Sequence, residues 1–203
     1  MDFVKAPTPK PLVPNSPVTP SVMTATMLNK FQFALPLQRQ EKLWQIMGLN
    51  LSKQTMANWI QYAYRDYLKP LIGLMKKQLL RENIFHADET PVHVLKEDGR
   101  MDNIIQSSRL FKAINYCLSH RNELMNYLRD GDCSISNNLA ERSIRPFTIG
   151  RKNWVFSGSP AGAEASAAAY SLIETCIANK VDTKEYLEYI FTNMSQEESL
   201  KDD

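Results

Sequence analysis

The chain has 203 residues, of which 43% are hydrophobic and 23% are charged, and its formal net charge at pH 7 is +2. This composition is typical of a globular protein with one moderate domain or two small ones, and it argues against a largely disordered chain. A free-standing nucleic-acid-binding domain usually carries a larger basic excess, so the distribution of charge is more informative than its total.

Basic and acidic residues gather in different parts of the chain. Residues 137–155 contain one acid, Glu141, and four basic side chains: Arg142, Arg145, Arg151 and Lys152. Residues 182–203 contain seven acids and two lysines. The ordinary interpretation of each run is a solvated face, and we favour it for the acidic tail.

The spacing of the cysteines and the N-terminal sequence indicate the cellular compartment in which we expect the protein. Cys117, Cys133 and Cys176 are scattered and form no CxxC pair, which argues against a zinc ribbon or a disulfide framework. The chain has neither a signal-peptide pattern nor an apolar stretch long enough to span a bilayer. We therefore expect a cytoplasmic protein that makes no membrane contact.

The chain divides into four predicted regions of a mainly helical α+β fold. Six of the eleven prolines fall within residues 1–20, which predicts an extended arm or linker. Residues 21–82 have the spacing of helices. Residues 83–160 mix strand, turn and helix signals, and residues 161–203 contain two helices and the acidic tail.

Residues 37–63 predict two helices joined by a short turn. Gly48 should end the first helix, and Ser52 should cap the second. The second helix should continue past Pro70, with a kink, to about Leu80. Its apolar face comprises Met56, Trp59, Ile60 and Ala63. This pattern is that of a helix-turn-helix, although many helical hairpins that never contact DNA share it.

The later elements are predicted in the same way. Residues 84–95 suggest a strand that Pro91 confines to an edge or to its start. Helices are expected over residues 107–128, over a short segment from Asn138 that ends at Pro146, over residues 161–179 and over residues 183–193. A loop rich in glycine, serine and proline is expected within residues 147–160.

Asp88 and Glu141 are candidate metal ligands, and each has an ordinary structural alternative. Asp88 follows a buried strand, where a carboxylate could bind Mg²⁺ or could simply cap a turn. Glu141 follows Asn138 by three residues, which is the spacing of a capping box. The spacing does not separate these roles, and a capped helix end would also hold the carboxylate in place.

Basic side chains surround Glu141. Arg142, Arg145, Arg151 and Lys152 would suit contacts to phosphate groups, which position a nucleic acid without reading its bases. Trp154 could stack on an unpaired base. We favour a core position for it because Val155 and Phe156 follow it directly.

Several segments resemble bacterial DDE transposases of the insertion-sequence-66 type. Residues 86–91 (HADETP) resemble the first acidic motif of that family. Residues 137–146 (NNLAERSIRP), 150–154 (GRKNW) and 170–174 (YSLIE) resemble its C-terminal motif. Residues 35–59 are similar to its helix-turn-helix segment. The resemblance covers roughly residues 17–194.

The resemblance implies a ribonuclease-H-like core in which three acids bind Mg²⁺ ions and activate a nucleophile for attack on DNA. Carried over to this chain, Asp88 is the first acid and Glu141 is the last. The 53 residues between them leave no room for the strand that bears the second acid. Asp98 and Asp102 are the nearest replacements, and both are more simply explained as solvated turn acids.

The sequence therefore predicts an internal deletion joined near residues 99–106, with residues 83–160 as the remnant of the catalytic core: its first strand together with C-terminal helices. We expect little Mg²⁺-dependent DNA cleavage or strand transfer, because one metal ligand is missing. Transposon ends are the expected DNA partner, and an intact transposase or a second copy of the chain is a possible protein partner. Two alternatives stay open: a non-catalytic DNA-binding regulator that acts through the helix-turn-helix, and a chain that does not fold stably.

Overall fold

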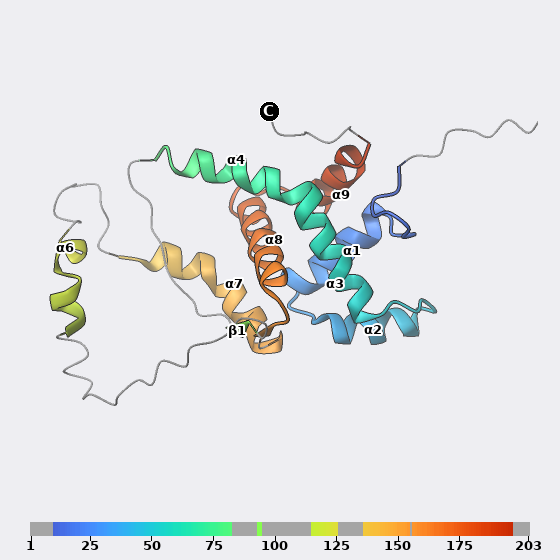
Figure 1. Ribbon diagram of the computed structural model, residues 1–203, viewed down its shortest axis with the longest axis horizontal. Helices are drawn as coiled ribbons and strands as arrows, with labels where there is room; N and C mark the ends of the chain where they lie inside the picture. The colour runs from blue at the N-terminus through green and yellow to red at the C-terminus, as the bar shows by residue number, and fades with distance from the viewer. Residues whose placement is uncertain (1–9, 83–92, 95–114, 126–135, 155, 197–203) are drawn as a thin grey trace, which may run out of the picture.

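The computed structural model describes residues 10–82, 93–94, 115–125, 136–154 and 156–196, and within them it is mainly helical (Figure 1). The helices are α1 (Pro20–Phe31), α2 (Leu37–Ile46), α3 (Lys53–Ala63), the π-helix η1 (Tyr64–Leu68), α4 (Lys69–Leu79), α6 (Arg121–Leu124), α7 (Asn138–Trp154), α8 (Pro160–Ala178) and α9 (Thr183–Met194). Two short strands are described, β1 (His93–Val94) and β2 (Phe156–Ser157). The predicted mainly helical class is confirmed.

The hairpin of α2 and α3 forms where the sequence predicts it. Gly48 has a φ of 83°, a left-handed conformation that glycine adopts without strain at the end of a helix. The Ser52 hydroxyl accepts a hydrogen bond of 3.0 Å from the Thr55 amide and so caps α3. All four residues of the predicted apolar face are buried: Met56, Trp59, Ile60 and Ala63.

The long second helix changes direction as expected, but one turn before the proline. Residues 64–68 form a π-helix, and the Lys69 amide donates to the Tyr64 carbonyl five residues earlier. This wider turn leads into α4, in which Pro70 occupies the first turn, where its missing N–H costs nothing. Figure 1 shows the chain turning between α3 and α4.

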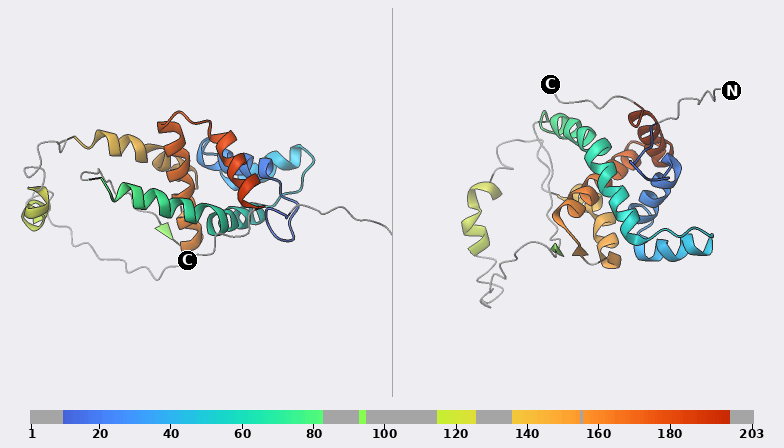
Figure 2. Two further views of the ribbon diagram at one scale, coloured as in Figure 1. Left: turned by 90° about the horizontal axis from the view of Figure 1, so that it is seen from above. Right: turned by 45° about the vertical axis from the view of Figure 1, so that its right-hand side comes forward.

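One hydrophobic core joins the N-terminal helices to the two C-terminal ones. Figure 2 shows α9 beside α1, and these two helices are in extensive contact. The largest apolar side chains that are fully buried come from both ends of the chain: Met23, Met27, Phe31, Met56, Leu68, Ile173, Leu187 and Phe191. Regions far apart in the sequence therefore fold together.

Part of the proline-rich arm packs against this core. Leu12 and Val18 are buried, and the Tyr67 hydroxyl donates a hydrogen bond of 2.6 Å to the Leu12 carbonyl. Within the predicted arm or linker, residues 10–19 therefore lie against the core at these two side chains. Composition alone missed this because the two anchoring apolar residues are widely spaced among the prolines.

The short helix predicted to end at Pro146 is wrong: α7 continues to Trp154. A proline inside a helix removes one backbone hydrogen bond and costs about 3 kcal/mol. Packing of the following turns offsets this cost. The Phe147 ring meets the Tyr170 ring edge-on at a centroid distance of 5.1 Å and the Trp154 ring at 5.6 Å. The predicted loop is therefore shorter and begins after α7.

The remaining predictions are confirmed in part. The strand expected over residues 84–95 is described at β1, which pairs in parallel with β2 through His93 opposite Phe156. The rest of that segment lies outside the described residues, so the ribonuclease-H-like core stays a prediction. Residues 115–119 and 121–124 are helical, within the helix expected over 107–128. Among the described helices, none is both long enough and apolar enough to cross a membrane.

Candidate functional site

One face of α7 brings three of the predicted site residues together. Glu141, Arg142 and Arg145 line a shallow cavity of about 400 Å³ with Asn138. Helical residues three, four and seven apart share a face, and the three charged side chains are exposed. We call Asn138, Glu141, Arg142, Arg145 and Lys152 the α7 face.

The two other basic residues lie nearer the end of α7. Lys152 follows Arg145 by two helical turns, so it continues the same face, and it is exposed. Arg151 is half-buried and lies to the side of this line. Within the described residues, Arg142, Arg145 and Lys152 have no carboxylate partner. The face is therefore open to an external anion.

The start of α7 differs from the predicted capping box by one residue. The helix begins at Asn138, and the Glu141 amide donates a hydrogen bond of 3.0 Å to the Asn137 carbonyl. Asn137 therefore occupies the cap position, and Glu141 is the fourth helical residue instead of the third. A carboxylate in the first turn is still favoured by the helix dipole, so the ordinary explanation of this acid remains.

The partner predicted for Glu141 lies outside the described residues, as do Asp98 and Asp102. Among the described residues, no group of three histidines, cysteines or acids could hold a metal, and Glu141 is the only acid of α7. On α7 the described part of the chain thus supplies a single carboxylate, that of Glu141. One carboxylate is not enough to form a Mg²⁺ site, because this ion binds several oxygen ligands. A shared metal between Asp88 and Glu141 stays a prediction.

The position of β1 limits how such a pair could form. Glu141 precedes Trp154 by 13 residues, which is about 20 Å along a helix. β2 follows Trp154 closely and pairs with β1 at His93. Asp88 lies five residues before His93, and five extended residues reach at most ~17 Å. A shared metal therefore requires the chain before β1 to run back along α7.

The C-terminal end of α7 is a packing site. Trp154 is half-buried and packs against the core, in agreement with the favoured prediction. Burial raises the pKa of the Tyr170 hydroxyl, and Gly150 lies against this hydroxyl and the Trp154 indole nitrogen. The segments 150–154 and 170–174, which resemble a family motif, thus hold α7 against α8.

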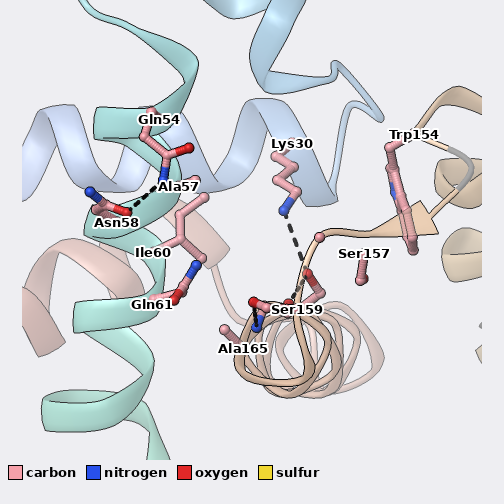
Figure 3. A pocket seen from close by; sticks show the side chains of 13 residues that line it. Lys30, Gln54, Ala57, Asn58, Ile60, Gln61, Trp154, Ser157, Ser159 and Ala165 are labelled. Atoms are coloured by element: carbon pink, nitrogen blue, oxygen red, sulfur yellow. Dashed lines mark hydrogen bonds between the residues drawn. The ribbon is translucent and has the colours of Figure 1, made fainter. Parts of the chain in front are cut away.

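A second cavity, of about 500 Å³, was not predicted from the sequence (Figure 3). Figure 3 shows Lys30 of α1 between the polar side chains of α3 on one side and Trp154 on the other. Its polar lining comprises Lys30, Gln54, Asn58, Gln61, Ser157, Ser159 and Ser166. The one feature of this cavity that the sequence could have indicated is Lys30, a charged residue between the buried residues Leu28 and Phe31 of α1.

The described fold and the α7 face define a mainly helical protein with an exposed basic strip along one helix. Comparison with protein families identifies it further. The model of the family described as "Transposase IS66 family" matches residues 15–104 and 98–165, which is more than half of the chain. The chain therefore belongs to the IS66 family of transposases, as the sequence motifs suggested.

Relatives among curated proteins match only in part. The uncharacterized protein y4qI of Sinorhizobium fredii (strain NBRC 101917 / NGR234) is 39% identical over 101 residues, which is 50% of this chain and 18% of the relative. The uncharacterized protein y4hP of the same strain is 38% identical over 82 residues, 40% of this chain and 15% of the relative. The chain thus spans less than a fifth of these relatives. No solved structure matches it.

Proposed function

We propose that the chain is a shortened transposase-family protein that binds DNA in connection with transposition and lacks strand-transfer activity. The observation that carries this proposal is that the family matches in two separate segments, which overlap at residues 98–104. This junction falls where the missing second acid already predicted a deletion, near residues 99–106. A continuous catalytic core would match as one segment, so the break supports loss of the intervening sheet.

The α7 face supports the DNA-binding part of the proposal. Arginines in this arrangement contact phosphate groups without reading the sequence, and neither arginine forms an ion pair with a carboxylate of the described residues. The α2–α3 hairpin is a second candidate contact, because its predicted caps and apolar face are present. A non-catalytic regulator of an intact relative would act through this hairpin and would need no active site.

The catalytic part is tested by DNA cleavage. The purified chain is incubated with Mg²⁺ and a labelled duplex that carries the ends of its own element, beside a full-length family member as positive control. We expect the wild type and Asp88→Ala to give equally little product, because two acids do not hold the metal pair of this chemistry. Robust cleavage by the wild type that Asp88→Ala abolishes would contradict the proposal.

The DNA-binding part is tested at the α7 face. We expect the double variant Arg142→Gln/Arg145→Gln to bind duplex DNA roughly ten-fold or more weakly at moderate salt. It should also reduce the slope of log affinity against log salt by about 1.8, since each lost phosphate contact removes about 0.9. Fluorescence anisotropy over a range of salt concentrations measures both quantities.

A charge-matched control is available on α4. Lys76 and Lys77 are exposed and line neither cavity, so Lys76→Gln/Lys77→Gln makes the same change in net charge. If this control weakens binding as much as the arginine variant, net charge and not the α7 face governs DNA affinity.

A further inference from the structure

The cavity between α1, α3 and α8 has an uncompensated positive charge. Among the described residues that line it, Lys30 is the only charged one. Its amine donates a long hydrogen bond of 3.5 Å to the Ser166 hydroxyl and lies 4.7 Å from the centre of the Phe31 ring. In the described part of the chain it has no carboxylate partner. The described residues therefore contain no negative charge that would stabilise this cation.

Partial burial makes this charge unfavourable in the isolated protein. Burial lowers the pKa of the Lys30 amine from 10.5 to about 8, because removal from water disfavours the charged form. A methionine at this position would fill similar space without that penalty. The lysine is therefore better explained by an external anion than by packing.

The other walls of the cavity offer hydrogen-bond donors. The Asn58 side chain uses its oxygen to accept from the Gln54 amide at 3.0 Å, which leaves its own amide hydrogens free. Gln61 also lines the cavity, and within the described residues its side chain has no hydrogen-bond partner. Ser159 caps the first turn of α8, so the positive end of that helix lies at the same cavity.

We propose that this cavity binds a phosphate group of the DNA backbone, with the Lys30 amine as its cation and the Asn58 and Gln61 amides as its donors. The inference rests on the proposed DNA-binding function. Both amides belong to α3, the second helix of the α2–α3 hairpin. A phosphate bound here would hold the DNA backbone against that helix and fix its position without reading the bases. Inorganic phosphate in solution has the same chemistry, so it is the alternative ligand for this cavity.

The first experiment measures DNA affinity by fluorescence anisotropy as salt rises from 50 to 200 mM. Lys30→Gln should weaken binding several-fold and reduce the salt slope by about 0.9, the effect of one phosphate contact. Lys30→Arg keeps the charge and should retain most of the slope. Lys76→Gln, an exposed lysine of α4, should change neither quantity.

Thermal melts separate a binding role from a structural one. Lys30→Gln should melt at the wild-type temperature or above it, because it removes an uncompensated charge. A clearly lower melting temperature together with an unchanged salt slope would show that Lys30 is only structural, and the inference would be wrong.

The second experiment labels lysines with a limiting acylating reagent at pH 8 and reads each site by mass spectrometry. Lys30 should be acylated at this pH, because burial lowers the pKa of its amine to about 8 and leaves part of it uncharged. Duplex DNA should then protect Lys30 but not Lys76. Intact DNA binding without protection of Lys30, and with an unchanged slope for Lys30→Gln, would refute the cavity as the contact and leave the proposed function standing.

The same labelling distinguishes the two sources of phosphate. If the wild type binds no DNA and millimolar inorganic phosphate protects Lys30, the cavity is a site for free phosphate, and both the DNA assignment and the DNA-binding function are wrong. If neither ligand protects Lys30 and the chain binds no DNA, both proposals fail together.

Discussion

Replacement of Gly150 by alanine is expected to lower the free energy of unfolding by about 2 kcal/mol, the usual cost of an added methyl group in a packed site. A Cβ at this position would collide with the Tyr170 hydroxyl and lie 3.3 Å from the Trp154 indole nitrogen. Neither α7 nor α8 can easily move away, because the Phe147 ring packs against Tyr170 beside this point. Chemical denaturation followed by circular dichroism measures the loss.

Two further variants make this test specific. Tyr170→Phe removes the colliding oxygen, which is buried without a hydrogen-bond partner in the described residues, so the double variant Gly150→Ala/Tyr170→Phe should recover most of the stability. Gly73→Ala in α4 meets nothing within 4 Å and should raise stability by about 0.5–1 kcal/mol through helix propensity alone. If Gly150→Ala behaves like Gly73→Ala, the close contact between α7 and α8 is absent.

This expectation changes how the C-terminal motif is interpreted. The resemblance placed Gly150 and Trp154 in the same C-terminal motif as Glu141, and the sequence analysis favoured a core position for Trp154. In the structure Gly150, Trp154 and Tyr170 form a packing contact, whereas Glu141 lies nine residues before Gly150, on the exposed start of α7. A chain without strand-transfer activity would keep such a contact, because it holds α7 against the core.

The elements that the sequence predicted well are those governed by local physics. Thr19, Ser52, Ser159 and Asp182 each cap a helix with a side-chain oxygen, and apolar spacing then marks the buried face. Pro146 misled the prediction because the continuation of α7 depends on Phe147 packing against Tyr170, a contact between residues 23 positions apart. A local rule contains no such information.

The candidate site was predictable to a similar extent. Arg142, Arg145 and Glu141 lie on one face of α7 because helical spacing requires it, whereas their role as a site stays a prediction. The cavity at Lys30 was missed because its walls come from α1, α3 and α8, and the Ser166 hydroxyl is 136 residues away from the amine that it contacts. No local pattern brings these segments together.

Replacement of Gln40 by glutamate is expected to cost at least about 3 kcal/mol at pH 7, the penalty of burying an unpaired charge that also loses its hydrogen bonds. Gln40 is fully buried. Its side-chain amide donates hydrogen bonds of 3.2 Å to the Thr26 carbonyl and 3.0 Å to the Leu35 carbonyl. A carboxylate has no hydrogen to donate, so it would face two carbonyl oxygens and repel both.

The pH dependence of this variant identifies the cause. Burial against carbonyls raises the folded-state pKa of a glutamic acid above its unfolded value of about 4.3. Its stability deficit relative to wild type should therefore be largest at pH 7 and shrink as the pH falls toward 4.3, where the protonated acid can donate one hydrogen bond. Gln40→Met removes the donors without adding charge and should cost less, with no such pH dependence.

Because Gln40 joins α2 to α1, the glutamate variant should loosen α2 first. Amide hydrogen exchange along Leu37–Ile46 should then be faster than exchange in α3. If the two variants lose the same free energy of unfolding at every pH, the two hydrogen bonds of Gln40 do not hold α2. Gln40 would then not anchor the α2–α3 hairpin on α1.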